Sequence, residues 1–176
     1  AAHQITLQIA AILFMVPFGI SLAATVRVGH ADGRGDPEGS RRAGIAALAL
    51  GAGFMVLMTA VIAATRHALP PLFLGAVTPD TAATAALVAT LLLVGPVFFV
   101  FDGIQTIGAG ALRGLNDTRV PFLIANSGFC SLGLASCWVL GVHTSLGPLG
   151  VWLGLSARLI AQAILLAWRF HWLTAP

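Results

Sequence analysis

Charge and reactive side chains are scarce in this sequence of 176 residues. It has no lysine, no tyrosine and two cysteines, and its Arg, Asp and Glu side chains number 15. Ordinary soluble domains are about 25% charged, whereas this chain is 9% charged and 58% hydrophobic. The composition excludes a disordered chain, a coiled coil and a disulfide scaffold, and so few charges cannot coat a soluble protein of this size.

Long stretches of the sequence carry no charge at all. The charge-free windows are 1–26, 43–65, 81–101 and 120–157. A helix needs about 20 apolar residues to cross the hydrocarbon core of a bilayer. The sequence therefore predicts an all-α, multi-pass transmembrane helix bundle. We expect five spanning helices, at residues 4–26, 43–65, 82–110, 121–142 and 148–168.

The basic residues predict how these helices are oriented. If the spans alternate in direction, seven of the nine arginines fall on one side: Arg27, Arg34, Arg41, Arg42, Arg113, Arg119 and Arg169. The positive-inside rule puts this side, and the C-terminus with it, in the cytoplasm. The net charge of +3 then follows from orientation in the lipid bilayer, and no nucleic-acid partner is expected.

Local patterns mark helix ends and membrane interfaces. The run Asp36-Pro37-Glu38 reads as N-cap, first-position proline and first-turn acid of the second helix. Trp138 and Trp152 fall near the expected outer interface. This placement is typical of an aromatic belt.

Asp102 is the most informative single residue. It lies inside the third expected helix, where a carboxylate at mid-membrane costs roughly 2.5–3.5 kcal/mol. Such a group can exchange a proton or a sodium ion as water access changes, so we favour Asp102 as a cation-coupling site. A structural aspartate paired to a neighbour is the alternative.

Two prolines interrupt the expected helices. Pro17 lies in the first and Pro96 in the third, six residues before Asp102, and each removes a backbone hydrogen bond and predicts a kink. Transporters often place bent helices next to ion sites. The alternative is that membrane helices simply tolerate proline.

Arg158 is the second charge deep in an expected span. It lies about ten residues from either end of the fifth helix, roughly 15 Å at helical rise, too far for complete snorkelling. We hypothesise that it lines an internal cavity and pairs with Asp102; a lipid-facing arginine with local water is the alternative. Further cavity-lining candidates are Gln4, Gln105, Asn126 and Gln162.

Enzyme and cofactor motifs are missing from the sequence. There is no phosphate-binding Gly-rich loop with Lys, no His-Glu-x-x-His and no Cys-x-x-Cys. The five histidines are scattered near helix ends. We expect neither an enzyme nor a bound metal or cofactor, apart from a coupling Na⁺ or H⁺ at Asp102.

Three stretches taken together resemble a known family. They are AAHQITLQIAAILFMVPFGISLAATVRVGH (1–30), DGIQTIGAGALRGLNDTRVPF (102–122) and GPLGVWLGLSARLIAQAILLAWRF (147–170). They look like the C-terminal lobe of MATE (multidrug and toxic compound extrusion) transporters, most of all the NorM type. The resemblance implies a fold of twelve helices in two lobes, of which residues 1–176 would supply helices eight to twelve. The N-terminal lobe would be absent, and the chain would be a fragment.

The resemblance also implies an activity. Members of the family exchange incoming Na⁺ or H⁺ for outgoing amphipathic cationic drugs in the bacterial inner membrane, and Asp102 matches an aspartate that couples the cation. The sequence departs from the pattern at Phe98, where tyrosine occurs, at Leu22, where glutamine is common, and at Arg158, where glycine is usual. The leading reading is a multidrug antiporter. A flippase for lipid-linked precursors and a non-functional truncated remnant are the alternatives.

Overall fold

The computed structural model describes residues 2–74, 79–129, 133–143 and 147–175, which form helices and turns and contain no strand. The helices are α1 (Ala2–Asp32), α2 (Pro37–Thr65), α3 (Leu69–Leu74), α4 (Pro79–Gly114), α5 (Arg119–Gly128), α6 (Leu134–Val142) and α7 (Pro148–Leu173). The all-α bundle predicted from the charge-free windows is confirmed. The segments long and apolar enough to cross a membrane are α1, α2, Gly95–Gly114 of α4 and Leu149–Leu173 of α7.

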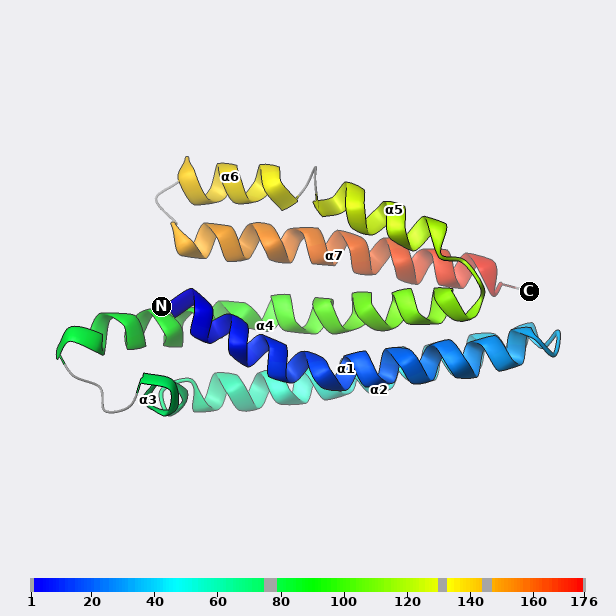
Figure 1. Cartoon of the computed structure of the whole chain (residues 1–176), viewed down its shortest axis with the longest axis horizontal. Helices are drawn as coiled ribbons and strands as arrows, with labels where there is room; N and C mark the ends of the chain where they lie inside the picture. The colour runs from blue at the N-terminus through cyan, green and yellow to red at the C-terminus, as the bar shows by residue number, and fades with distance from the viewer. Residues whose placement is uncertain (1, 75–78, 130–132, 144–146, 176) are drawn as a thin grey trace.

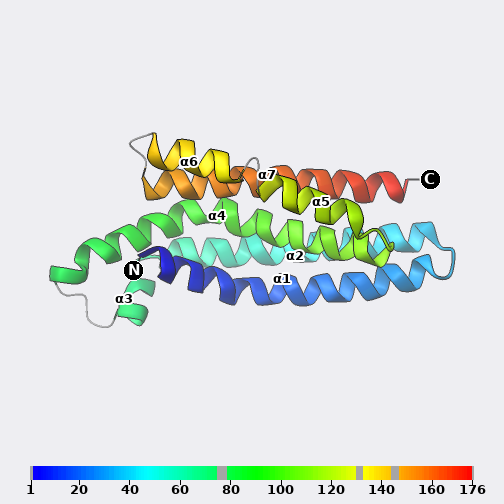
Figure 2. The same ribbon diagram turned by 45° about the horizontal axis from the view of Figure 1, so that its top comes forward.

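Helix α4 lies at the centre of the bundle. It packs against α1 and α2 on one side and against α7 on the other. Helices α5 and α6 pack against α7, and Figures 1 and 2 show them running beside it. Much of the middle of α4 is therefore covered by other helices, and Asp102 lies in this part of the helix, half-buried.

The connections gather at the two ends of the bundle. The turn between α1 and α2, the turn between α4 and α5, and the C-terminus lie at the same end, and the N-terminus lies at the other (Figure 1). The seven arginines that the alternating topology puts on one side belong to these turns or to the helix ends beside them. The arrangement has the charge asymmetry that orients helices in a bilayer.

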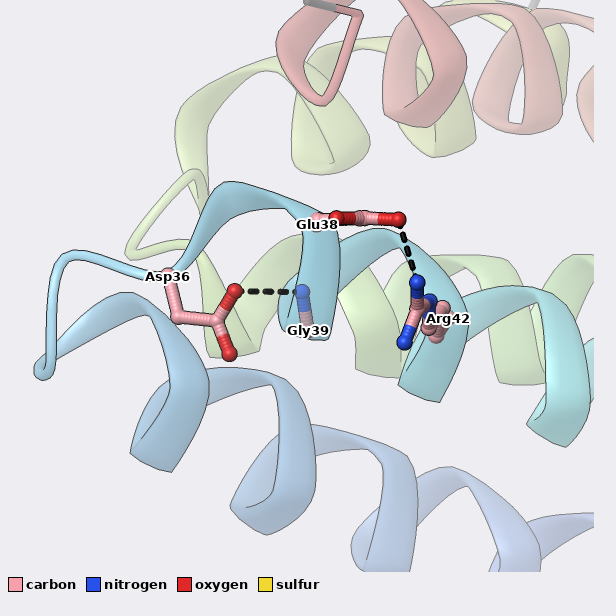
Figure 3. A network of polar contacts seen from close by, with 4 residues as sticks. All are labelled: Asp36, Glu38, Gly39 and Arg42. Atoms are coloured by element: carbon pink, nitrogen blue, oxygen red, sulfur yellow. Dashed lines mark hydrogen bonds and ion pairs between the residues drawn. The ribbon is translucent and has the colours of Figure 1, made fainter.

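The start of α2 follows from its first residues. The Asp36 carboxylate accepts a hydrogen bond of 2.7 Å from the backbone N–H of Gly39, and Pro37 occupies the first helical position. Glu38, in the first turn, forms an ion pair with Arg42 (Figure 3). The N-cap predicted at Asp36 is confirmed, and α2 begins with a polar turn before its apolar stretch.

The fourth expected span, 121–142, is described in two parts. They are α5 and α6, with π-helical geometry at Phe129 and Gly133, and residues 130–132, including Cys130, lie outside the described residues. The single span over 121–142 therefore stays a prediction. Two glycines in this region lie close to α7: a Cβ on Gly128 would lie 2.6 Å from Nε2 of Gln162, and one on Gly133 would lie 2.8 Å from Cδ of Arg158. Glycine lets α7 pack closely here but favours a helix least among residues other than proline.

Trp152 is a packing residue of the bundle, and its place at the level of the outer interface stays a prediction. Its side chain is fully buried, and its Nε1–H donates a hydrogen bond of 3.2 Å to Nδ1 of His3. Phe98 and Phe99 of α4 meet the Trp152 ring edge to face, with ring centres 5.1 Å and 6.3 Å away. The tryptophan thus joins α7 to α4 and α1, because the bundle buries this face of α7. Trp138 is 63% exposed.

Candidate cation site within the helix bundle

Asp102 lies on α4 in the part of the helix that packs against its neighbours. It is half-buried. At the next residue, Gly103, α4 lies close to α2 and α1: a Cβ there would be 2.7 Å from Cγ of Met55 and 3.5 Å from Cβ of Pro17. Among the described residues, no hydrogen bond or ion pair reaches the Asp102 carboxylate. The site therefore offers an acidic group that no neighbouring cation neutralises by contact.

The ion pair hypothesised between Arg158 and Asp102 is not formed in the part of the chain that the structure describes. The Arg158 side chain runs instead toward α5 and α6. Its guanidinium carbon lies 5.4 Å from the ring centre of Phe129, and its Cδ fills the space that Gly133 leaves free. Its Nε is buried without a hydrogen-bond partner.

Gln162 is part of the contact between α7 and α5. Its Nε2 donates hydrogen bonds to the backbone carbonyls of Ile124 and Ala125, at 3.3 Å and 3.1 Å. Its Oε1 is buried without a partner. The side chain therefore joins α7 to α5 at their interface, a contact that could not be predicted from the sequence.

The remaining cavity-lining candidates are not brought together. Gln105 is half-buried on α4, one turn after Asp102, whereas Gln4 and Asn126 are exposed on α1 and α5. None of these side chains lines either of the two grooves found among the described residues. On this chain, then, Asp102 and Gln105 form the polar face of α4, and the role of the others as cavity residues stays a prediction.

The kinks expected at Pro17 and Pro96 also stay predictions. Both prolines lie inside continuous helices, and Pro17 is buried against α4 at Gly103. Figure 2 shows α4 following a bent course. Proline removes one backbone hydrogen bond wherever it stands inside a helix, so each of these helices contains a carbonyl that its own backbone leaves free.

Two hydroxyl groups of α1, those of Ser21 and Thr25, contact backbone carbonyls of α4, and the sequence alone does not predict this contact, which we call the polar clamp. Ser21 Oγ donates to the carbonyl of Thr106 at 2.9 Å. Thr25 Oγ1 lies within hydrogen-bonding distance of two carbonyls and shares its one hydrogen between them: that of Gly110 on α4, at 2.8 Å, and that of Ser21 on its own helix, at 2.9 Å. The two hydroxyls are one turn apart, as are the two carbonyls. Gly110 and Gly114 are four residues apart in the sequence, a spacing that allows close helix packing. The two hydroxyls show that the partner of this glycine face is α1.

The bundle of apolar helices, the charge asymmetry of its ends and the isolated acid in α4 define the class: a multi-pass helical membrane protein. The sequence matches the MatE family over residues 1–139. The chain belongs to this family.

Individual relatives agree with this assignment. The chain is 61% identical over 175 residues to a "Probable multidrug resistance protein NorM" of Rhodopseudomonas palustris, which covers 99% of the chain and 36% of that protein. It is 48% identical over 171 residues to the "Multidrug resistance protein NorM" of Burkholderia vietnamiensis, covering 97% of the chain and 37% of that protein. The chain thus spans little more than a third of the length of the curated relatives it matches.

Solved structures show the same fold at low sequence identity. The chain superposes on the eukaryotic MATE transporter AtDTX14 with a TM-score of 0.85 and 20% identity, over 96% of the chain and 36% of that protein. An inward-facing MATE family multidrug resistance transporter of the MOP superfamily matches with a TM-score of 0.82, also at 20% identity, over 98% of the chain and 39% of that protein. The helix arrangement is therefore that of part of a MATE transporter.

Proposed function

We propose that this chain forms most of the C-terminal lobe of a multidrug antiporter, which exports amphipathic organic cations in exchange for Na⁺ or H⁺. The proposed setting is the bacterial inner membrane, with the arginine-rich end and the C-terminus in the cytoplasm. An N-terminal lobe would complete the pathway. The observation that carries the proposal is the half-buried Asp102 carboxylate in the central helix, with no contacting cation among the described residues.

The physical case starts from the cost of an isolated charge. A carboxylate between apolar helices is stabilised by a bound proton or metal cation, and it becomes costly again when that cation leaves. Occupancy of Asp102 would therefore bias the helices around it between two arrangements, which is what coupling to transport requires. Asp102 lies on α4, which packs against α1, α2 and α7, so a shift of α4 would move its contacts with these helices.

Arg158 would modify this coupling. Its guanidinium does not contact Asp102 among the described residues, but charges inside a medium of low dielectric interact over longer distances than they do in water. A nearby positive charge stabilises the empty carboxylate and so competes with the incoming cation. We therefore expect removal of the Arg158 charge to strengthen cation binding at Asp102 and to slow cation release.

A chimera tests the proposal with a complete pathway. Residues 1–176 replace the matching third of the Rhodopseudomonas relative, and the chimera is reconstituted into liposomes that contain ethidium, an amphipathic cationic dye. Dye transport is measured under an imposed Na⁺ gradient or an imposed pH gradient. The expected result is gradient-driven transport by the chimera, which Asp102→Asn reduces at least tenfold and the exposed-site control Asp32→Asn leaves unchanged.

Other outcomes would contradict the proposal. Gradient-driven transport that survives Asp102→Asn would remove Asp102 from the coupling step. A chimera that inserts and folds but moves no dye under either gradient would favour the truncated remnant. Transport by residues 1–176 alone would overturn the need for a second lobe.

A further inference from the structure

A groove runs between α1 and α2, near the turn that joins them, and nothing in the proposed transport mechanism uses it. Its volume is about 480 Å³, within the range of about 300–1,000 Å³ that small-molecule sites occupy. The lining residues are Ile20, Ala23, Ala24, Arg27, His30, Ala31, Arg34, Gly39, Ala43, Ala46, Ala47 and Leu50. The many alanines leave the space open, because no large side chain from either helix fills it.

The groove is apolar at one end and basic at the other. Ile20 and Leu50 lie at the deep end, while Arg27 and Arg34 lie toward the turn. From Ile20 to the end of α1 at Asp32 the helix rises about 18 Å, compared with about 15 Å for the hydrocarbon of one leaflet, and Arg34 lies in the turn that follows. The groove therefore extends through one leaflet and into the level of the lipid headgroups, with its arginines at the headgroup end.

The two arginines in the groove are not neutralised by nearby acids. Asp36 caps α2 through the Gly39 backbone, and Glu38 is paired with Arg42, as Figure 3 shows. Among the described residues, neither the Arg27 guanidinium nor the Arg34 guanidinium has a hydrogen bond or ion pair, and both residues are exposed. A ligand with a negative head would meet two free guanidinium groups.

We propose that this groove binds an anionic phospholipid, with the headgroup phosphate between Arg27 and Arg34 and one acyl chain along the alanines. Guanidinium groups bind phosphate oxygens in a fork geometry, and basic pockets between transmembrane helices bind anionic headgroups. A cationic drug would be repelled at the mouth. A neutral helix from another chain would leave both arginines unneutralised.

Native mass spectrometry of the whole chain in detergent tests the proposal. The protein is titrated with phosphatidylglycerol and with phosphatidylcholine of the same acyl chains, and the lipid retained per protein is compared. One arginine near a membrane surface contributes about fivefold to the binding of an anionic lipid, so two contribute about thirtyfold. We expect Arg27→Gln with Arg34→Gln to remove most of the preference for phosphatidylglycerol.

Two further variants separate the groove from general surface charge. Arg113→Gln with Arg119→Gln removes two exposed arginines at the same end of the bundle, outside the groove, and should keep the preference. Ala46→Leu fills the apolar part and should weaken retention of both lipids without changing their ratio. Circular dichroism checks that each variant stays helical.

Several results would overturn the proposal. The parent chain could retain both lipids equally, or the Arg27 and Arg34 variant could keep its preference. The control pair of arginines could lower the preference as much as the groove pair. Unchanged retention in Ala46→Leu would mean that headgroups bind at the surface with no acyl chain in the groove.

Discussion

Replacing Gly110 by alanine is the sharpest test of how α1 and α4 pack. A Cβ at Gly110 would stand 2.2 Å from Oγ of Ser21 and 2.5 Å from its carbonyl oxygen, whereas ordinary contact begins at 3.4 Å. The hydroxyl can rotate, but the carbonyl belongs to the helix backbone. Helix α1 must therefore move away by about 1 Å to restore van der Waals separation.

That displacement breaks the polar clamp as well. The hydrogen bonds from Ser21 to Thr106 and from Thr25 to Gly110 measure 2.9 Å and 2.8 Å, and a further 1 Å takes both beyond the usual limit of about 3.2 Å. Each interhelical hydrogen bond in a membrane contributes about 0.6 kcal/mol on average, and overpacking costs about 1–3 kcal/mol. The expected loss in the free energy of unfolding is about 2–4 kcal/mol.

The assay is unfolding in mixed micelles by increasing the mole fraction of SDS, followed by tryptophan fluorescence. The buried Trp152 reports on the packing of α7 against α4 and α1. Gly53→Ala is the control, because a Cβ on this helical glycine meets nothing within 4 Å, and alanine favours a helix over glycine by about 1 kcal/mol. A Gly110→Ala protein as stable as the Gly53→Ala protein would refute the close approach of the two helices.

Two smaller predictions concern a helix cap and a helix contact. Asp36→Ala removes the N-cap bond to Gly39 and should destabilise the first turn of α2 by about 1 kcal/mol, seen as faster amide hydrogen exchange there; unchanged exchange would contradict the capping role. Gln162→Leu removes two hydrogen bonds but also an unpaired buried Oε1, so stability should change by less than about 0.5 kcal/mol. Gln162→Ala opens a cavity and should cost about 2 kcal/mol; equal effects of the two substitutions would contradict this account.

The sequence was informative about where helices run and much less about which faces meet. Charge-free windows predicted the spans, and the Asp36 cap was readable because capping depends on neighbours in the sequence. The position of Asp102 inside a span was equally local. These features need no knowledge of tertiary contacts.

Facing relationships could not be read because the helices are apolar nearly all round. Periodicity then carries no information about which side is buried. For this reason the packing partners of Trp152 could not be predicted, and Arg158 was paired with Asp102 although it lies against Phe129. The close fit of Gly128 and Gly133 to side chains of α7 is likewise a tertiary effect, which the sequence alone does not show.

The clamp between α1 and α4 has a mechanical consequence. Packed helices slide past one another when side chains can exchange places in the grooves between them. Here backbone faces backbone at Gly110 and Gly114, and two hydroxyls bridge to opposite carbonyls, so no such exchange is available. Helices α1 and α4 would move as one rigid piece, and any relative motion within this bundle would fall to the contacts that these two helices make with the others.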